Sequence, residues 1–129
     1  MLIGIDMERI SKVRNVVDIE ALKTNQTGIL NSVFSDEEIK YCLSKRYPVK
    51  HFAVRFAGKE AFLKALGTGL RGKILLSEIQ FYNDELGKPN IKCIGNVKAE
   101  IEKRNISSMQ VSFSHSGNNV VAVVILEEK

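Results

Sequence analysis

The 129-residue sequence has no tryptophan, only two prolines and only two cysteines. Cys42 and Cys93 stand far apart, form no CxxC pair and no cysteine–histidine cluster, and are therefore expected to be reduced structural thiols rather than zinc ligands. No apolar run approaches the roughly 18 residues that a membrane-spanning helix needs, so no membrane segment is expected. The opening residues MLIGIDMERI lack the basic leader of a signal peptide, which makes the cytoplasm the expected location.

What remains is the composition of an ordinary folded domain. Apolar residues make up 44% and charged residues 26%, and the length suits one domain over residues 1–129. The net charge of +4 favours an anionic partner, such as a nucleotide, a nucleic acid or an acidic protein. Because basic runs and alternating basic and aromatic residues are missing, a nucleic-acid partner is not expected.

The hydrophobic pattern predicts an α+β fold, a largely antiparallel sheet packed with helices, in the order β-α-α-α-β-β-α-β-β. Strands are predicted at 1–5, 74–82, 90–94, 109–116 and 120–126. Helices are predicted over about 8–16, 35–45, 50–66 and 97–105, with residues 18–32 read as a helix broken near Gly28. The strand at 120–126, VVAVVIL, is apolar throughout and should be buried on both faces.

Helix ends are marked by local signals. Ser35 and Glu38 have the spacing of a capping box, which predicts that a helix begins after Ser35. Pro48 precedes the long helix and Gly67 suits the left-handed position that follows its last turn. The GxGxxG match at 67–72 follows a helix rather than a strand, so it is interpreted as a cap and loop, although nearby Arg71 and Lys73 are candidates to touch a phosphate.

The predicted helix over 50–66 has charged residues in an unexpected place. Its apolar stripe is formed by Phe52, Phe56, Leu63 and Leu66. Lys59 falls inside this stripe, and Glu60 and Lys64 lie at its flank. One interpretation is a solvated Glu60–Lys64 pair, with Lys59 reaching water along its aliphatic stem. The other is the wall of a site, with a carboxylate for a cation and ammonium groups for an anion.

A cation site needs a second carboxylate, because Mg²⁺ is usually held by one or two carboxylates together with phosphate oxygens and water. Asp6 and Glu8 are the candidates. The alternative is that Asp6 caps a helix beginning near residue 8, with Glu8 as a first-turn acid. His115, which ends an alternating strand between Ser114 and Ser116, is either structural or part of a rim that contacts phosphate.

Three segments, taken together, resemble the 4′-phosphopantetheinyl transferases. They are GIDMERI, RFAGKEAFLKALGTG and VSFSHSGNNVVAVVIL, and the segments FSDEEIKYC and NDELGKP fit as well. The resemblance covers nearly the whole chain. The length and the GTG and GKP elements are similar to the short, single-domain holo-acyl-carrier-protein synthase type.

The resemblance implies a reaction. Coenzyme A donates 4′-phosphopantetheine to a serine of an acidic apo acyl carrier protein, with Mg²⁺ on the pyrophosphate and adenosine 3′,5′-bisphosphate as the other product. It also implies a homotrimer with sites between subunits and a place in fatty acid and lipid biosynthesis. The alternatives are a non-catalytic coenzyme A or nucleotide-binding module, against which Asp6, Glu60 and Lys64 argue, and a Mg²⁺-dependent pyrophosphate hydrolase, whose Glu-rich helix motif is missing.

The resemblance also implies roles for individual residues. The metal ligands are Asp6 and Glu60, and Glu8 is a third candidate because Asp6-Met7-Glu8 departs from the Asp-x-x-Glu spacing usual in the short type. Glu60 and Lys64 are the catalytic residues, and the serine is deprotonated by either Lys64 or a water on the metal. The expected contacts of coenzyme A are Arg55, Lys59, Lys64, His115, Ser116 and Pro89. The expected contacts of the carrier protein are Lys12 and Arg14, on a basic helix.

Overall fold

Five strands form two antiparallel sheets in the computed structural model, which describes residues 1–24, 28–67 and 74–129. The larger sheet has the order β1-β5-β4 and consists of β1 (Leu2–Arg9), β5 (Asn119–Glu128) and β4 (Ile106–Ser116). The smaller is a hairpin of β2 (Ile79–Asn83) and β3 (Pro89–Cys93). Arg71, Lys73 and most of the GxGxxG segment lie outside the described residues.

Along the chain, most of the helices come after β1 and before β2. They are α1 (Ile10–Arg14), α2 (Ile19–Lys23), α3 (Asp36–Leu43), α4 (Pro48–Leu66) and α5 (Gly95–Lys103), with 3₁₀ turns η1 (Gly28–Ser32) and η2 (Leu76–Glu78). The predicted antiparallel α+β fold is confirmed, and the segment 18–32, predicted as a helix broken near Gly28, contains α2 and η1. Within the described residues, no helix combines the length and apolar character needed to cross a membrane.

The local end signals of the helices are confirmed. The Ser35 hydroxyl accepts from the Glu38 backbone N–H at 3.2 Å, and the Glu38 carboxylate accepts from the Ser35 N–H at 3.0 Å, so the capping box is complete. Pro48 is the first residue of α4, where its missing N–H costs nothing. Gly67 follows the helix with φ of 75°, a backbone conformation that a side chain would strain.

The first strand is longer than predicted. β1 pairs with β5 as far as Arg9, and Asp6 lies opposite Ala122 in this ladder. α1 therefore begins only at Ile10, with Arg9 at its N-cap and no acidic residue in its first turn. The interpretation of Asp6 as a helix cap, and of Glu8 as a first-turn acid, is wrong because pairing with the long β5 extends the strand past both residues. The strand predicted at 74–82, by contrast, is shorter than expected. It begins only at Ile79, because residues 76–78 form η2.

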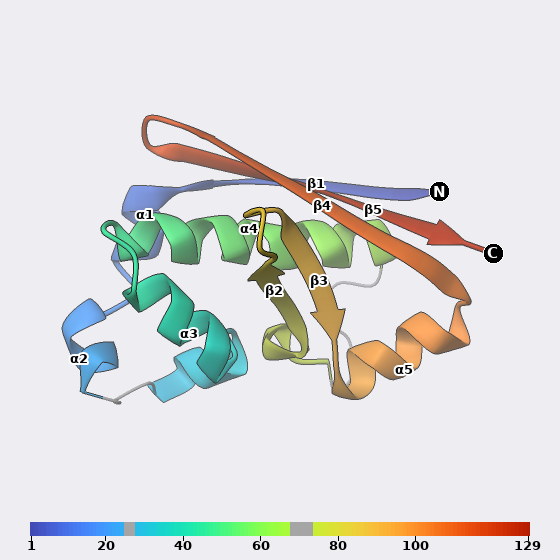
Figure 1. Cartoon of the computed structure of the whole chain (residues 1–129), viewed down its shortest axis with the longest axis horizontal. Coiled ribbons are helices and arrows are strands. Elements are labelled where there is room, and N and C mark those ends of the chain that lie inside the picture. The colour runs from blue at the N-terminus through green and yellow to red at the C-terminus, as the bar shows by residue number, and fades with distance from the viewer. Residues whose placement is uncertain (25–27, 68–73) are drawn as a thin grey trace.

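Helix α4 lies against one face of the larger sheet (Figure 1). The residues of β5 on this face, Val120, Ala122, Val124 and Leu126, are fully buried or nearly so. Gly4 permits the close approach of β1, because a Cβ atom there would lie 1.8 Å from the Ala61 carbonyl oxygen. The opposite face of β5 remains half-buried, so the prediction that 120–126 is buried on both faces holds for one face within this chain.

Candidate active site

The contact between β1 and α4 brings Asp6 to the flank of the helix. Side chains alternate along a strand, so Gly4, Asp6 and Glu8 share the face of β1 that is turned toward α4. Lys64 of α4 donates from Nζ to Asp6 Oδ1 at 2.8 Å and to the Ile5 carbonyl oxygen at 3.1 Å. The structure thus joins the two segments that carry the predicted metal ligands, which are more than 50 residues apart in the sequence.

One oxygen of Asp6 has no hydrogen-bond partner. Oδ2 is buried, and no described residue donates to it. An unpaired buried carboxylate oxygen is costly, and a bound cation is one way to satisfy it. No group of three or more His, Cys, Asp or Glu side chains among the described residues is arranged as a ready-made metal site. A metal at Asp6 and Glu60 would therefore need further oxygen ligands, such as those of phosphate and water, which Mg²⁺ commonly keeps.

Three carboxyl groups repel one another at this place. Burial and then the charge of Asp6 raise the pKa of Glu60 above its ordinary value. Burial and then the neighbouring Asp6 raise the pKa of Glu8 to about 7. The hydrogen bond to Asp6 raises the pKa of Lys64, which is therefore a cation at neutral pH. The cluster has oxygen donors and excess negative charge, which is the chemistry that a hard divalent cation requires.

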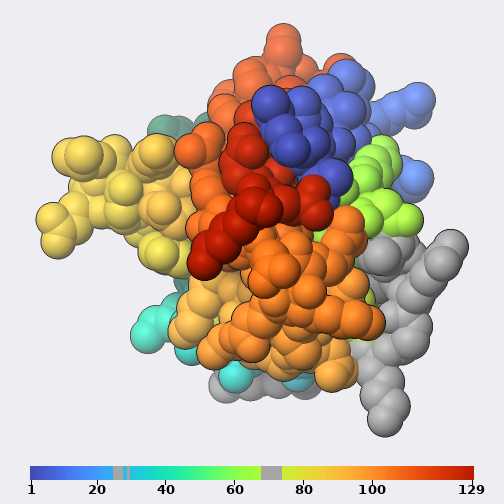
Figure 2. Space-filling view, turned by 90° about the vertical axis from the view of Figure 1, so that its right-hand side faces the viewer, coloured from blue at the N-terminus to red at the C-terminus, as the bar shows by residue number. Residues whose placement is uncertain are grey.

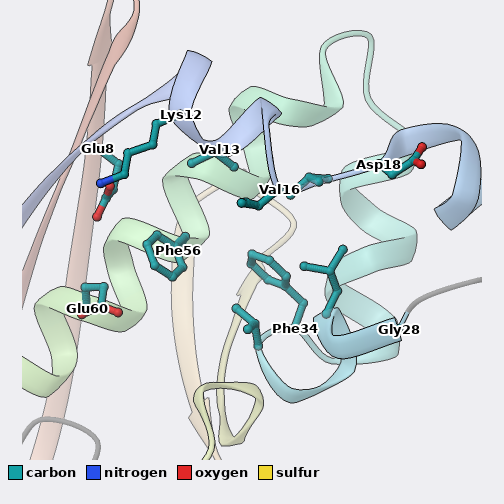
Figure 3. Close-up of a pocket in the computed structure, with 12 residues that line it drawn as sticks. Glu8, Lys12, Val13, Val16, Asp18, Gly28, Phe34, Phe56 and Glu60 are labelled. Atoms are coloured by element: carbon teal, nitrogen blue, oxygen red, sulfur yellow. The ribbon is translucent and has the colours of Figure 1, made fainter.

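A cavity of about 620 Å³ opens beside these carboxylates (Figure 3). Glu8, Lys12 and Glu60 lie at one end of it, and Asp18 lies at the other. The wall between them is mainly apolar and is formed by Val13, Val16, Val17, Leu30, Val33, Phe34 and Phe56. The cavity can therefore hold apolar groups next to the polar end where a metal would bind.

Lys59 is not at the surface, contrary to the expectation that it contacts coenzyme A. Its side chain is 0% exposed, and Nζ donates to Glu38 Oε1 at 2.7 Å, to the Leu76 carbonyl oxygen at 3.0 Å and to that of Ile79. Burial lowers the pKa of Lys59, and the charge of Glu38 acts against this shift. Sequence spacing placed Lys59 correctly within the apolar stripe, but the stripe faces the core and the lysine finds its partner there.

Arg55 is also an interior residue. It is 2% exposed, its Nη2 donates to Asn83 Oδ1 at 2.8 Å, and its guanidinium lies 4.1 Å from the centre of the Tyr41 ring. Its Nε has no hydrogen-bond partner among the described residues. Arg55 therefore supplies positive charge from just inside the surface, while Asn83 and Tyr41 hold it in place.

Further basic residues gather near Arg55. Lys45 lies 4.6 Å from the centre of the Tyr41 ring, and His51 packs edge-on against the same ring. Burial and then Lys50, Arg55, Lys45 and His115 lower the pKa of His51 to about 4. The sequence analysis missed His51, although its position four residues before Arg55 places both on one side of the helix.

The remaining predicted residues lie at separate places. His115 and Ser116 are exposed at the end of β4 and line a shallow depression with Met7 and Val121. Pro89 begins β3 opposite Asn83, the residue that holds Arg55. Lys12 and Arg14 are both exposed on α1, but only Lys12 lines the large cavity. The structure therefore brings Asp6, Glu8, Glu60, Lys64 and Lys12 together and sets the other candidates apart from them.

The model of the 4′-phosphopantetheinyl transferase superfamily matches residues 2–124 of this chain. The chain belongs to this superfamily. Among curated members, the holo-[acyl-carrier-protein] synthase of Geotalea daltonii is 40% identical over 97% of this chain and 96% of its own length. That of Syntrophus aciditrophicus is 42% identical over 95% and 90%. Both relatives bear the name of the short, single-domain type that the sequence resembles, the holo-acyl-carrier-protein synthases.

Solved structures of the superfamily share the fold. The holo-[acyl-carrier-protein] synthase of Neisseria meningitidis has a TM-score of 0.84 and 31% identity, covering 99% of this chain and all of its own. The enzyme from Helicobacter pylori, solved in complex with coenzyme A, has a TM-score of 0.78 and 28% identity, covering 98% of this chain and all of its own. The likeness therefore extends over nearly the whole of this chain.

Proposed function

We propose that this transferase moves 4′-phosphopantetheine from coenzyme A to a serine of an apo acyl carrier protein and releases adenosine 3′,5′-bisphosphate. The observation that carries the proposal is the grouping of Asp6, Glu60 and Lys64, in which one buried oxygen of Asp6 has no partner within the part of the chain that the structure describes. Membership of the superfamily and the likeness to a relative crystallised with coenzyme A support it.

The carboxylate cluster is the proposed Mg²⁺ site. Asp6 and Glu60 would hold the ion from opposite sides of the contact between β1 and α4, and Glu8 is the proposed third ligand. When bound, Mg²⁺ supplies positive charge that offsets the charge of the pyrophosphate as its bond breaks. Burial and then the neighbouring Asp6 raise the pKa values of Glu8 and Glu60, and a bound cation would offset the cost of keeping both groups charged.

In the proposed transfer, the serine oxygen bonds to the phosphorus that carries the pantetheine arm. The bond from this phosphorus to the bridging oxygen breaks, and the bridging oxygen leaves with adenosine 3′,5′-bisphosphate. The serine proton passes to a carboxylate of the cluster or to water. Lys64 is held as a cation by Asp6, so we assign it to charge stabilisation beside the leaving phosphate rather than to taking this proton.

The basic residues near the start of α4 are the proposed site for the phosphates of coenzyme A. Lys45, Lys50 and His115 surround His51, and Arg55 adds charge from just inside the surface. His115, Ser116 and Pro89 remain proposed contacts of the nucleotide. Lys59 is removed from this set, because its ammonium group is enclosed by Glu38 and two backbone carbonyls.

The carrier protein is proposed to dock at α1. Lys12 and Arg14 are exposed there, and an acidic carrier would complement their charge. Lys12 also stands at the carboxylate end of the large cavity (Figure 3), so a carrier bound to α1 would place its serine near Asp6 and Glu60. The serine of the docked carrier and the proposed metal ligands would then lie at the same end of the cavity.

The outer face of the large sheet is the proposed contact between subunits of a homotrimer. Ile3, Ile5 and Met7 of β1 alternate on this face and are 58% to 66% exposed. Figure 2 shows β1 at the surface beside β5, whose outward residues are half-buried valines and isoleucine. Exposed apolar patches of this kind mark interaction surfaces. Because Met7 shares a depression with His115 and Ser116, a neighbouring subunit on this face would complete the nucleotide site.

Mass spectrometry tests the proposed function. Several purified apo carrier proteins of fatty-acid, polyketide and peptide type are mixed with coenzyme A, Mg²⁺ and the enzyme, and the carrier mass is measured. We expect one phosphopantetheine arm on a serine of at least one carrier, and none after chelation of the metal. Binding of coenzyme A without any gain in carrier mass would instead support a non-catalytic binding module, and release of bisphosphate without a carrier would support a hydrolase. Light scattering on the same sample is expected to give about three times the mass of one chain.

A further inference from the structure

The buried pair of Lys59 and Glu38 takes no direct part in the proposed reaction. Both side chains are almost completely shielded from water, at 0% and 1% exposure. Burying two charges is expensive unless their hydrogen bonds are satisfied, and removing one partner alone is strongly destabilising. A pair of this kind in the middle of the helix that carries Glu60 therefore calls for a specific explanation.

Four segments of the chain meet at this pair. Lys59 of α4 donates to Glu38 of α3 and to the carbonyl oxygens of Leu76 in η2 and Ile79 in β2. Glu38 accepts from Lys59 and from the Ser35 N–H through Oε1, and from the Phe81 N–H at 3.1 Å through Oε2. Every donor of Lys59 and both oxygens of Glu38 are therefore used, which fixes the position of each side chain.

The pair is connected to both walls of the candidate site. Glu60 follows Lys59 directly, and successive helical side chains differ in direction by about 100°, so an inward anchor at Lys59 sets the direction of Glu60. On the other side, Glu38 caps the helix that begins after Phe34 and Ser35. The Phe34 ring lines the cavity and lies 5.5 Å from Lys59 Nζ. One buried ion pair thus fixes the helix of the metal ligand and the wall that faces it.

We infer that Lys59 and Glu38 are positioning residues. They hold Glu60 against Asp6 for metal binding, and they fix the position of Phe34 in the cavity wall that faces Glu60. This inference rests on the proposed function, because it takes Glu60 as a ligand of the cation. Without the ammonium group, the carbonyl oxygens of η2 and β2 lose their donor, and α4 loses its polar link to α3, η2 and β2. Glu60 then no longer meets Asp6 in the arrangement that binds a divalent ion.

Mn²⁺ binding measures this positioning without any turnover. The variant Lys59→Met keeps an unbranched side chain that is one atom shorter and removes its charge. We expect its Mn²⁺ dissociation constant, followed by electron paramagnetic resonance, to rise by about tenfold or more, as supporting contacts around metal ligands typically contribute 10–100-fold. The matched control is Val97→Ala, a buried residue of α5 with no polar atom to join the network. It is expected to lower the melting temperature and leave Mn²⁺ affinity unchanged.

A second variant covers the case in which Lys59→Met does not fold. Lys59→Met/Glu38→Gln leaves no unpaired charge in the core, and replacements of whole buried pairs are often tolerated. We expect it to fold, to bind Mn²⁺ weakly, and to need more Mg²⁺ for half-maximal carrier modification. Wild-type Mn²⁺ affinity in either folded variant overturns the inference. Failure of the wild-type enzyme to modify any carrier would overturn the proposed function instead, and the Mn²⁺ comparison would be unaffected.

Discussion

Helix α4 carries two lysines that each pair with a carboxylate at nearly the same distance. Lys59 is 2.7 Å from Glu38, and Lys64 is 2.8 Å from Asp6. The first pair is buried and all of its hydrogen bonds are made, whereas the Lys64 side chain is 56% exposed and one oxygen of Asp6 has no partner among the described residues. Distance alone therefore does not separate a structural pair from one that is proposed to take part in the reaction. Burial and unused hydrogen-bonding capacity do.

The largest expected effect concerns the stability of the two pairs. Lys59→Met should lower the free energy of unfolding by about 3–5 kcal/mol, because it leaves the Glu38 carboxylate buried without its counter-ion. Lys64→Met should lower it by about 1 kcal/mol or less, as is usual for exposed pairs. Urea denaturation at pH 7 measures both. Equal losses would remove the distinction between the pairs.

Glu60 and Asp6, the two proposed metal ligands, should show the opposite behaviour. Glu60→Gln is expected to fold normally and to reduce carrier modification on the order of 100-fold, because the amide keeps the shape and loses the charge that binds the cation. Asp6→Asn should act in the same way, since Asp6 caps no helix. Rates are measured at limiting Mg²⁺, with the exposed Glu37→Gln of α3 as the control. Near-normal turnover by Glu60→Gln would exclude it as a metal ligand.

A substitution at Gly4 should break the Asp6–Lys64 ion pair and leave the buried Lys59–Glu38 pair intact. In Gly4→Ala, the new methyl group meets the backbone of Ala61, so β1 must move away from α4. We expect a loss of about 1–3 kcal/mol in stability, as overpacking usually causes, together with a higher Mg²⁺ requirement.

The control for Gly4→Ala is Val97→Ala, which destabilises the core by truncating a fully buried side chain of α5. It should destabilise the protein without raising the Mg²⁺ requirement. Thermal melting and Mg²⁺ titration of activity, performed on both variants, separate the two effects. A similar Mg²⁺ requirement in both would mean that Gly4 has no particular role in placing Asp6.

Lys12 and Arg14 of α1 can be compared with Lys59 and Lys64, because the described hydrogen bonds and ion pairs give neither of them a carboxylate partner. Reversal of both charges in Lys12→Glu/Arg14→Glu should raise the KM for the carrier protein several-fold and leave the KM for coenzyme A unchanged. The effect should shrink as salt rises, because exposed charges are screened over about 8 Å at physiological ionic strength. Steady-state kinetics at two salt concentrations test this. Equal losses for both substrates would place these residues in the coenzyme A site.

The smallest expected effect concerns His51. Its pKa in the folded protein is lowered to about 4 by burial and by the surrounding basic groups, so the unfolded chain takes up a proton first as pH falls. Stability should therefore decrease between about pH 6.5 and pH 4. In His51→Gln this part of the decrease should be absent. Urea midpoints at pH 7 and pH 5 measure the difference, and an unchanged slope in the variant would contradict it.

Several elements could be predicted because their signals are local. The capping box at Ser35 and Glu38 and the limits of α4 at Pro48 and Gly67 depend on residues a few positions apart, and the structure confirms them. The length of β1 could not be predicted in this way, because it is set by pairing with β5 more than 100 residues later. The site shows the same division: Glu60 and Lys64 stood out as charges at the flank of an apolar stripe, whereas His51 did not.

The sequence by itself was sufficient to predict the antiparallel α+β class and the family. Only the tertiary structure decided which of the two lysines of α4 is enclosed and which stays exposed. Lys59 and Lys64 are the same residue type on one helix, and helical spacing says only which face each occupies. Which face meets the core depends on η2, β2 and α3, which fold against α4 and enclose Lys59 with Glu38. Lys64 stays in solvent because β1 supplies only its edge there, with Asp6 and the Ile5 carbonyl oxygen as partners.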